Sequence, residues 1–246
     1  MDKDWFVNWF NTSYYHTLYQ HRDEAEACRF IDNLCEHLKI KQGAKILDLA
    51  CGKGRHSIHL AKKGFQTTGV DLAPESILKA KASSVSNVTF EVHDMRMAFK
   101  ENEFDFVFNL FTSFGYFKNQ LENIEVLKGI AINLKENACF VIDFLNAEKV
   151  IKNLVATENK TIDGIDFELK RTFDGVNITK DIIVKDNNQT YNYQENVSAF
   201  SLANMQEMAT KSGLQISDTF GDYDLNPFNV NSSDRLILVM MLKFNQ

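Results

Sequence analysis

Two glycines, Gly52 and Gly54, follow the apolar run 46–50. Glycine lets the backbone turn tightly, and it leaves no side chain between the backbone and a ligand that lies across the ends of strands. A glycine turn of this kind is typical of strand-to-helix junctions that bind nucleotides, but a purely structural turn has the same pattern. The turn therefore marks a candidate ligand site without identifying the ligand.

Two carboxylates stand where they could complete such a site. Asp71 ends the second apolar run, and Asp94, with Met95 beside it, follows the third. A carboxylate at the end of the second strand can accept hydrogen bonds from both ribose hydroxyls of an adenosine group. Asp94 could accept a hydrogen bond from an adenine amino group while apolar neighbours cover the ring. Either aspartate alone could be a solvated turn residue, but their register with the glycine turn favours adenosine binding.

The elements that position these residues alternate between strands and helices. A three-to-four spacing of apolar residues predicts helices, and short apolar runs predict strands. The predicted strands are 45–50, 66–70, 88–92, 104–110 and 139–144, and the predicted helices cover 27–38, a stretch that ends at Gly64, a segment that starts at Pro74, and 121–134. This alternation predicts a parallel sheet with helices on both faces. After a helix at 202–212, the strands 214–220 and 235–244 have no helix between them and should pair antiparallel.

The pattern changes after about residue 148, where side chains alternate with period two. The alternating residues are Phe167, Leu169, Arg171 and Phe173. Turn signals at 174–175 and 185–188 separate such segments, which predicts an antiparallel meander. We therefore expect an N-terminal helical cap with the first part of the core at 1–154, an antiparallel β insertion at 155–200, and the rest of the core at 201–246. The insertion could be a lid over the site or a dimer surface, in a monomer or a homodimer.

Composition narrows the classes of partner. The chain has 246 residues, a net charge of −6 and no Lys/Arg cluster, which weakens the case for nucleic-acid binding and favours a small or neutral ligand. No apolar run approaches the roughly 20 residues needed to cross a bilayer, and the N-terminus lacks a signal-peptide layout. The four cysteines form no C-x-x-C pair, so we expect no metal site and a cytoplasmic protein.

From Lys45 to Leu145 the chain resembles the class I S-adenosylmethionine-dependent methyltransferases. The resemblance rests on the motifs Asp-Leu-Ala-Cys-Gly-Lys-Gly at 48–54, Gly-Val-Asp-Leu at 69–72 and His-Asp-Met at 93–95. It is especially similar to an uncharacterised small-molecule-type branch with Gly-Arg-His-Ser after the turn and Phe-Thr-Ser-Phe-Gly-Tyr-Phe at 111–117. The resemblance implies an α/β, Rossmann-like fold with a seven-stranded, mainly parallel sheet and helices on both faces. The residue pattern predicts the antiparallel β insertion in addition.

Two positions depart from the expected patterns. The turn before the fifth strand lacks the usual glycine pair and reads Lys135-Glu-Asn-Ala138, where Asn137 can adopt the left-handed conformation more readily than most residues. Ser57 stands where a dinucleotide fingerprint has its third glycine or alanine. The second departure disfavours a dehydrogenase.

The resemblance implies an enzyme that transfers a methyl group from S-adenosylmethionine to an unidentified, small-molecule acceptor. Because the sulfonium is already an activated methyl donor, rate can come from holding the acceptor in line and excluding water. No catalytic motif is needed, and neither His56 nor His93 is assigned as a general base. The alternatives are an RNA or protein methyltransferase, and a non-catalytic nucleotide-binding regulator on the same fold.

The resemblance also implies positions for the cofactor. Its methionine half would lie along 50–54, its ribose and adenine would face the two aspartates, and its methyl would lie beside Asn109 and Leu110. Arg22 could pair with the cofactor carboxylate if the aromatic N-terminal segment folds back, or it could be a surface residue. The predicted cofactor-binding residues are Arg22, Asp48, Ala50, Cys51, Gly52, Gly54, Asp71, Leu72, Asp94, Met95, Asn109 and Leu110.

Four residues are candidates for contact with the acceptor. Phe114 and Tyr116 follow the fourth strand, and ligands of open α/β sheets bind beyond the carboxyl ends of strands. Tyr15 belongs to the aromatic N-terminal segment, which could wall the pocket or simply pack. Arg171 would reach the acceptor if the insertion is a lid.

Overall fold

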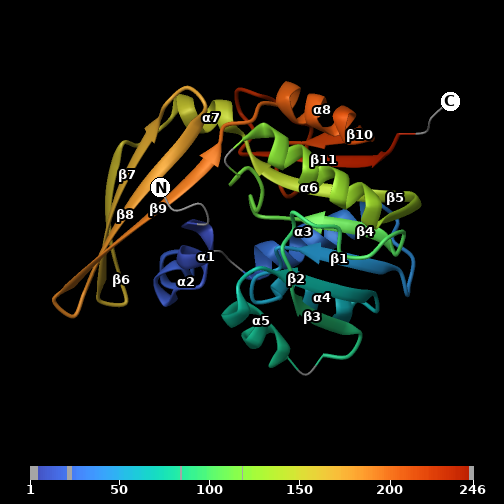
Figure 1. The fold of residues 1–246 in the computed structure, drawn as a ribbon, viewed down its shortest axis with the longest axis horizontal. Helices are drawn as coiled ribbons and strands as arrows, with labels where there is room; N and C mark the ends of the chain where they lie inside the picture. The colour runs from blue at the N-terminus through green and yellow to red at the C-terminus, as the bar shows by residue number, and fades with distance from the viewer. Residues whose placement is uncertain (1–4, 21–23, 84, 118, 244–246) are drawn as a thin grey trace.

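The computed structural model describes residues 5–20, 24–83, 85–117 and 119–243, which form two sheets (Figure 1). The seven-stranded main sheet has the order β10-β11-β5-β4-β1-β2-β3, and β11 pairs antiparallel with both β10 and β5 while the other pairs are parallel. Its strands are β1 (Lys45–Leu49), β2 (Gln66–Asp71), β3 (Val88–Val92), β4 (Phe104–Asn109), β5 (Leu134–Leu145), β10 (Leu214–Phe220) and β11 (Arg235–Leu242). The predicted mainly parallel sheet with an antiparallel last pair is confirmed.

Helices cover both faces of this sheet because its inner strands are apolar on both sides. Ile46 packs with α3 (Glu24–His37) and α4 (Arg55–Lys62), whereas Leu47 packs on the opposite face with α6 (Gln120–Asn133) and α8 (Leu202–Lys211). α5 (Pro74–Lys81) packs on β3 through Ile77, Ala80 and Phe90. α7 (Ala147–Lys152) follows β5. Within the described residues, no helix is long and apolar enough to cross a membrane.

The turn before β5 is a local irregularity of the main sheet. β5 begins at Leu134, earlier than the predicted residue 139, and its pairing with β4 jumps from Leu134 opposite Phe104 to Cys139 opposite Phe106. Asn137 has a φ of 62°. The left-handed asparagine therefore does here what a glycine pair would do, because its short side chain tolerates this conformation.

The second sheet is an antiparallel meander of β6 (Thr157–Ile162), β7 (Ile165–Phe173), β8 (Asn177–Asp186) and β9 (Gln189–Ser198), in that order. Gly175, with a φ of 99°, turns β7 into β8, and Asn187 and Asn188, both with positive φ, turn β8 into β9. The predicted antiparallel insertion is therefore confirmed. β6 has the polar sequence Thr-Glu-Asn-Lys-Thr-Ile, which gave no separate strand signal.

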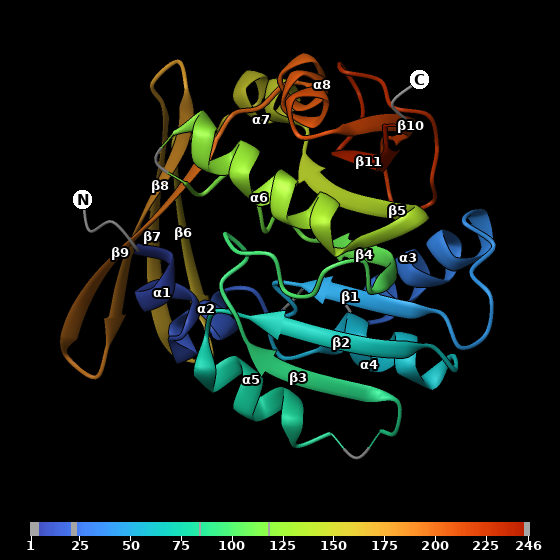
Figure 2. The ribbon, with the colours of Figure 1, turned by 45° about the vertical axis from the view of Figure 1, so that its right-hand side comes forward.

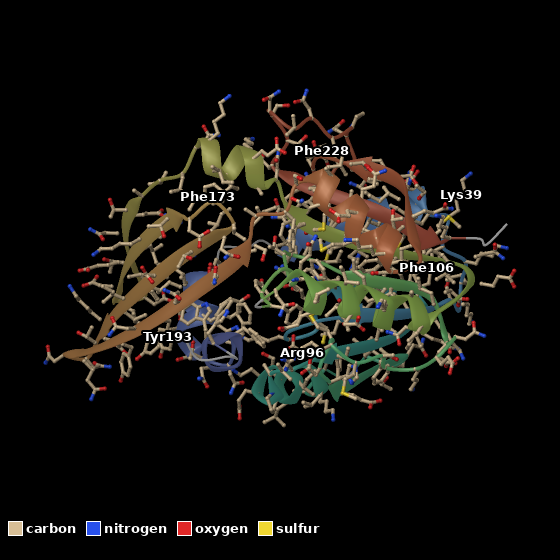
Figure 3. The ribbon with its side chains drawn as sticks, turned by 45° about the horizontal axis from the view of Figure 1, so that its top comes forward. Lys39, Arg96, Phe106, Phe173, Tyr193 and Phe228 are labelled. Carbon is tan, nitrogen blue, oxygen red and sulfur yellow. The ribbon has the colours of Figure 1, made fainter. Side chains whose placement is uncertain are left out.

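Two short helices, α1 (Trp5–Phe10) and α2 (Ser13–Leu18), cover one face of this second sheet. Trp9 and Leu18 are 1% and 2% exposed. They pack against a cluster on the meander made of Phe167, Leu169, Ile182 and Val184. The ring of Tyr193, labelled in Figure 3, lies with its centroid 4.8 Å from that of Trp9. We call α1, α2 and the second sheet together the cap.

Candidate active site

A cavity of about 600 Å³ lies where residues following β1, β2, β3 and β4 meet the cap. Figure 2 shows β1 and β2 pointing toward α1 and α2. Open α/β sheets bind ligands at this edge, and small-molecule pockets span roughly 300–1,000 Å³. The predicted site residues that line the cavity are Tyr15, Ala50, Cys51, Gly52, Asp71, Leu72, Asp94, Met95, Leu110 and Tyr116. The fold thus brings together residues that were predicted separately from four strand ends and from the aromatic N-terminal segment.

The two glycines of the turn have different surroundings. Gly52 lines the cavity with a φ of 56°, and no heavy atom lies within 4 Å of where its Cβ would stand. Gly54, with a φ of 81°, precedes α4, and a Cβ there would lie 2.6 Å from the Phe90 ring. Gly52 therefore leaves room for a ligand, whereas Gly54 allows α4 to pack closely on the sheet.

Asp71 fixes the glycine turn from the end of β2. Its Oδ2 accepts a hydrogen bond from the Gly52 N–H at 2.8 Å, and its Oδ1 accepts one from the Ala73 N–H at 2.8 Å. Burial raises the pKa of Asp71, although these backbone hydrogen bonds act in the opposite direction. The carboxylate therefore borders the cavity in a fixed orientation.

Asp94 is held by a neighbour that the sequence reading did not consider. Arg96 Nε donates to both carboxylate oxygens of Asp94, at 3.0 and 2.9 Å, and its Nη2 donates to Oδ2 at 2.5 Å. Burial alone would raise the pKa of Asp94, but the hydrogen bonds from Arg96 outweigh it and lower the pKa. Asp94 is therefore an ionised, oriented carboxylate at the cavity, beside Met95.

Asp48 and Asn109 lie behind the cavity rather than on its surface. Asp48 is 1% exposed and accepts a hydrogen bond from Ser57 Oγ at 2.5 Å. Burial raises the pKa of Asp48 to about 6. Asn109 is fully buried and donates to the Leu49 carbonyl at 3.0 Å, which ties the ends of β4 and β1 together. Both residues support the strand ends that carry the lining residues.

The loop after β4 is held by an ion pair between a buried carboxylate and a partly exposed arginine, which the sequence motifs did not predict. Phe111 and Thr112 both have positive φ. Asp143, fully buried in β5, accepts from the Phe111 N–H at 2.9 Å and from Arg235 Nε at 2.7 Å. Arg235 also donates to Thr112 Oγ1 at 2.8 Å and lines the cavity. A signal was present in the sequence, because Asp143 is a charged residue inside an apolar strand. A buried carboxylate needs a partner, so its position indicates an ion pair.

This loop decides which of the two predicted aromatic residues reaches the cavity. Tyr116 lines it, and its hydroxyl donates to the Thr112 carbonyl. Phe114 is fully buried instead and packs against Phe200 in the core. Arg171 lies on β7 outside the cavity lining and pairs with Glu158 at 2.6 Å. Arg22 lies outside the described residues.

His56 is buried at the start of α4 and also lines the cavity. Its Nε2 has no hydrogen-bond partner among the residues that the structure describes. Burial lowers the pKa of His56 well below its ordinary value, so the ring is neutral. A buried polar atom without a protein partner indicates a place for a polar ligand atom.

The cap supplies the wall opposite the strand ends. Phe6 and Phe10 from α1, Tyr19 after α2, and Glu195 and Val197 from β9 line the cavity. The aromatic N-terminal segment gave a signal for the first three residues. Glu195 gave none, because a single charge in a polar strand has no distinguishing pattern. Within the described residues, no group of three or more His, Cys, Asp or Glu side chains is arranged to hold a metal ion.

Comparison with known proteins finds a family model and several relatives that match part of the chain. Residues 46–137 match the family model described as "Methyltransferase domain". The chain is 36% identical over 114 residues to "Putative methyltransferase YqeM" of Bacillus subtilis. This aligned region covers 45% of this chain and 46% of that protein. The chain spans about half the length of this protein and of two other curated methyltransferase relatives that it matches.

Two solved structures share the fold over nearly the whole chain. An S-adenosylmethionine-dependent methyltransferase from Clostridium acetobutylicum has a TM-score of 0.80 at 19% identity, covering 94% of this chain and 96% of that one. CalS10, an amino pentose methyltransferase from Micromonospora echinaspora solved with SAM bound, has a TM-score of 0.71 at 17% identity, covering 94% and 98%. At these identities the likeness establishes the fold.

Proposed function

We infer that this chain, which carries a methyltransferase domain over residues 46–137 and has the class I fold of S-adenosylmethionine-dependent methyltransferases, transfers a methyl group from S-adenosylmethionine to a small molecule. One observation carries the proposal. A single cavity is lined by Gly52, which has no side chain, by the fixed carboxylate of Asp71, and by Asp94 with Met95. A glycine turn and an acidic strand end are the features with which α/β sheets bind the phosphate or backbone side and the ribose of adenosine-containing ligands.

The residues present fit this cofactor. The backbone of Ala50 to Gly52 would hold the methionine half, Asp71 the ribose, and Asp94 with Met95 the adenine. The unpartnered Nε2 of His56 supports this fit, because a neutral imidazole nitrogen can hydrogen-bond a polar ligand group. When bound, the cofactor supplies an activated methyl group on a sulfonium. The chain's own residues then have to orient the acceptor and exclude water.

The cap supports a small acceptor. Phe6, Phe10 and Tyr15 come from the N-terminal helices and line the same cavity as the strand-end residues. In this proposal an acceptor would fit between them and the cofactor, and the cap acts as a lid. CalS10, which shares the fold, is an amino pentose methyltransferase.

The cofactor assignment is tested by calorimetry with S-adenosylhomocysteine and with NAD. We expect the former to bind and to raise the melting temperature, and the latter to do neither. Binding of NAD alone would reject the assignment. Incubation with labelled S-adenosylmethionine and cell fractions then tests the acceptor class, and label found only in RNA would contradict a small-molecule acceptor.

Asp71→Ala tests the site itself. Loss of the carboxylate removes the ribose partner and releases the Gly52 N–H, so we expect S-adenosylhomocysteine affinity to fall by about tenfold to a hundredfold. The matched control is Asp105→Ala, because Asp105 also accepts a backbone N–H, that of Lys45 at 2.8 Å, but lies at the amino end of β4. This control should keep the wild-type affinity. Equal losses in both variants would mean that Asp71 acts only through the fold.

A further inference from the structure

Glu195 is a carboxylate inside the cap wall of the cavity. It lies on β9, its side chain is 15% exposed, and it lines the cavity beside Tyr19. Aromatic rings adjoin it in the lining, because the Tyr19 ring lies 5.1 Å from that of Tyr15, and the Tyr15 ring lies 4.9 Å from that of Phe10. Aromatic faces and a carboxylate together favour a cationic group over a neutral or anionic one.

The hydrogen bonds of Glu195 leave it capacity for one more donor. Among the described residues, Trp9 Nε1 donates to Oε1 at 2.7 Å, the Tyr19 hydroxyl is 2.8 Å from both oxygens, and Lys180 Nζ is 3.4 Å from Oε2. These are three donors, whereas a carboxylate has about four acceptor positions. The carboxylate is thus oriented by protein groups without being saturated by them.

Attachment of the cap does not account for this charge. Trp9 and Leu18 already hold the N-terminal helices to the second sheet through a buried apolar cluster. Lys180 is 13% exposed, so Lys180 and Glu195 form a largely buried ion pair. Such a pair loses much of its attraction to desolvation, and apolar residues of similar size often stabilise a fold as well or better. A ligand is therefore the better reason for a carboxylate at this position.

We propose that the acceptor is a primary or secondary amine, and that Glu195 binds its nitrogen and takes the proton that the amine must lose before methylation. This rests on the proposed function. The ammonium gives one proton to the Glu195 carboxylate, and the freed lone pair forms the N–CH3 bond. The C–S bond breaks, and its electron pair stays on the sulfur. Glu195 is then a catalytic residue, and Tyr19, Trp9 and Lys180 are positioning residues.

The first test uses the wild-type protein saturated with S-adenosylhomocysteine. Benzylamine and benzyl alcohol have the same ring and differ in the group that would meet Glu195. Calorimetry should show benzylamine binding about tenfold or more tightly than the alcohol, as a charge-assisted hydrogen bond predicts. Equal or weaker binding of the amine overturns the proposal. If S-adenosylhomocysteine itself does not bind, the proposed function fails instead.

The second test compares Glu195→Gln with Asp186→Asn. Asp186 is a matched control, because it also lies on the second sheet and accepts from a tyrosine of α2, Tyr14, at 3.0 Å, but it does not line the cavity. Glu195→Gln should lose the preference for benzylamine while keeping the affinity for S-adenosylhomocysteine. Asp186→Asn should keep both. A preference retained by Glu195→Gln overturns the proposal.

The role in proton transfer has its own readout. With benzylamine and S-adenosylmethionine, Glu195→Gln should lower kcat by about a hundredfold or more near neutral pH, the usual loss of a general base. The loss should shrink as the pH rises and the amine loses its proton without help. Turnover is followed by mass spectrometry of N-methylbenzylamine. A loss of kcat that does not change with pH would contradict a role in proton transfer.

Discussion

Gly52 and Gly54 are two residues apart and serve different ends. Both have positive φ, where a side chain costs roughly 1–2 kcal/mol per residue. Only at Gly54 does a second effect add to this cost, because its Cβ would stand 2.6 Å from the Phe90 ring. At Gly52 the space is open and belongs to the cavity.

Alanine at these two positions should therefore separate folding from binding. Gly54→Ala should lower the free energy of unfolding by about 2–4 kcal/mol, the conformational cost plus overpacking. Gly52→Ala should lower it by about 1–2 kcal/mol and should weaken S-adenosylhomocysteine binding, because its methyl group enters the cavity. Urea denaturation and calorimetry measure the two effects. Equal stability losses would show that the Phe90 contact relaxes at no cost.

Single residues also mark the limit of what the sequence could predict. Strand-end positions were predictable, since Asp71 and Asp94 follow apolar runs in register with the glycine turn. The choice between Phe114 and Tyr116 was not, because it depends on two consecutive left-handed residues, Phe111 and Thr112. Those conformations are held by Asp143, which is distant in sequence.

At the scale of elements, α1 and α2 depend on the sheet they cover. Each has six residues, which is too short for a stable isolated helix in water. Their stability comes from Trp9 and Leu18, which are buried against the meander. The same contacts cover an apolar face of the second sheet that would otherwise meet water. Helices and sheet should therefore form and open together.

Leu18→Ala tests this mutual dependence. Removal of a buried leucine side chain typically lowers the free energy of unfolding by about 2–5 kcal/mol. Hydrogen exchange should accelerate in β7 and β8 and stay slow in β1 and β4. Leu78→Ala is the control, because Leu78 is 65% exposed on α5 and its truncation should leave stability nearly unchanged. Uniform acceleration in both sheets would contradict a separately opening cap.

The elements of the cap differed in how well they could be predicted. Strict alternation and the turns at Gly175 and at Asn187 and Asn188 predict the meander from local chemistry alone. The aromatic N-terminal segment predicts burial but not where its helices begin and end. Those bounds depend on contacts with residues such as Ile182, far along the chain, which no local pattern encodes.

At the scale of the whole molecule, the cavity is complete only when distant parts of the chain meet. Its lining runs from Phe6 to Arg235, whereas the methyltransferase family match covers residues 46–137. The matched segment supplies the half of the cavity assigned to the cofactor. The cap and β11 supply much of the other half, including Glu195. Sequence motifs could therefore predict the first half, whereas for the second only the aromatic N-terminal segment, with Tyr15, gave a signal.

The stability of the whole fold should also depend on pH through one central group. Asp48 lies in β1, between β4 and β2 of the main sheet, and burial raises its pKa from 3.8 to about 6. Between these two values the folded chain keeps a proton that the unfolded chain has lost. The contribution of Asp48 to stability is therefore fully present below pH 4 and is lost as the pH rises through 6.

Asp48→Asn isolates this contribution, because asparagine has the shape of the protonated acid and does not titrate. Near pH 4 the two proteins should have similar free energies of unfolding. By pH 7.5 the wild type should have lost about 3 kcal/mol relative to the variant, since each unit of pKa shift is worth about 1.4 kcal/mol. Urea denaturation of both proteins at several pH values gives the difference between their free energies of unfolding. Groups that titrate alike in both proteins contribute nothing to this difference. A difference that stays constant from pH 4 to pH 7.5 would mean that Asp48 is already ionised in the folded protein at pH 4, so that the buried hydrogen bond from Ser57 outweighs its desolvation.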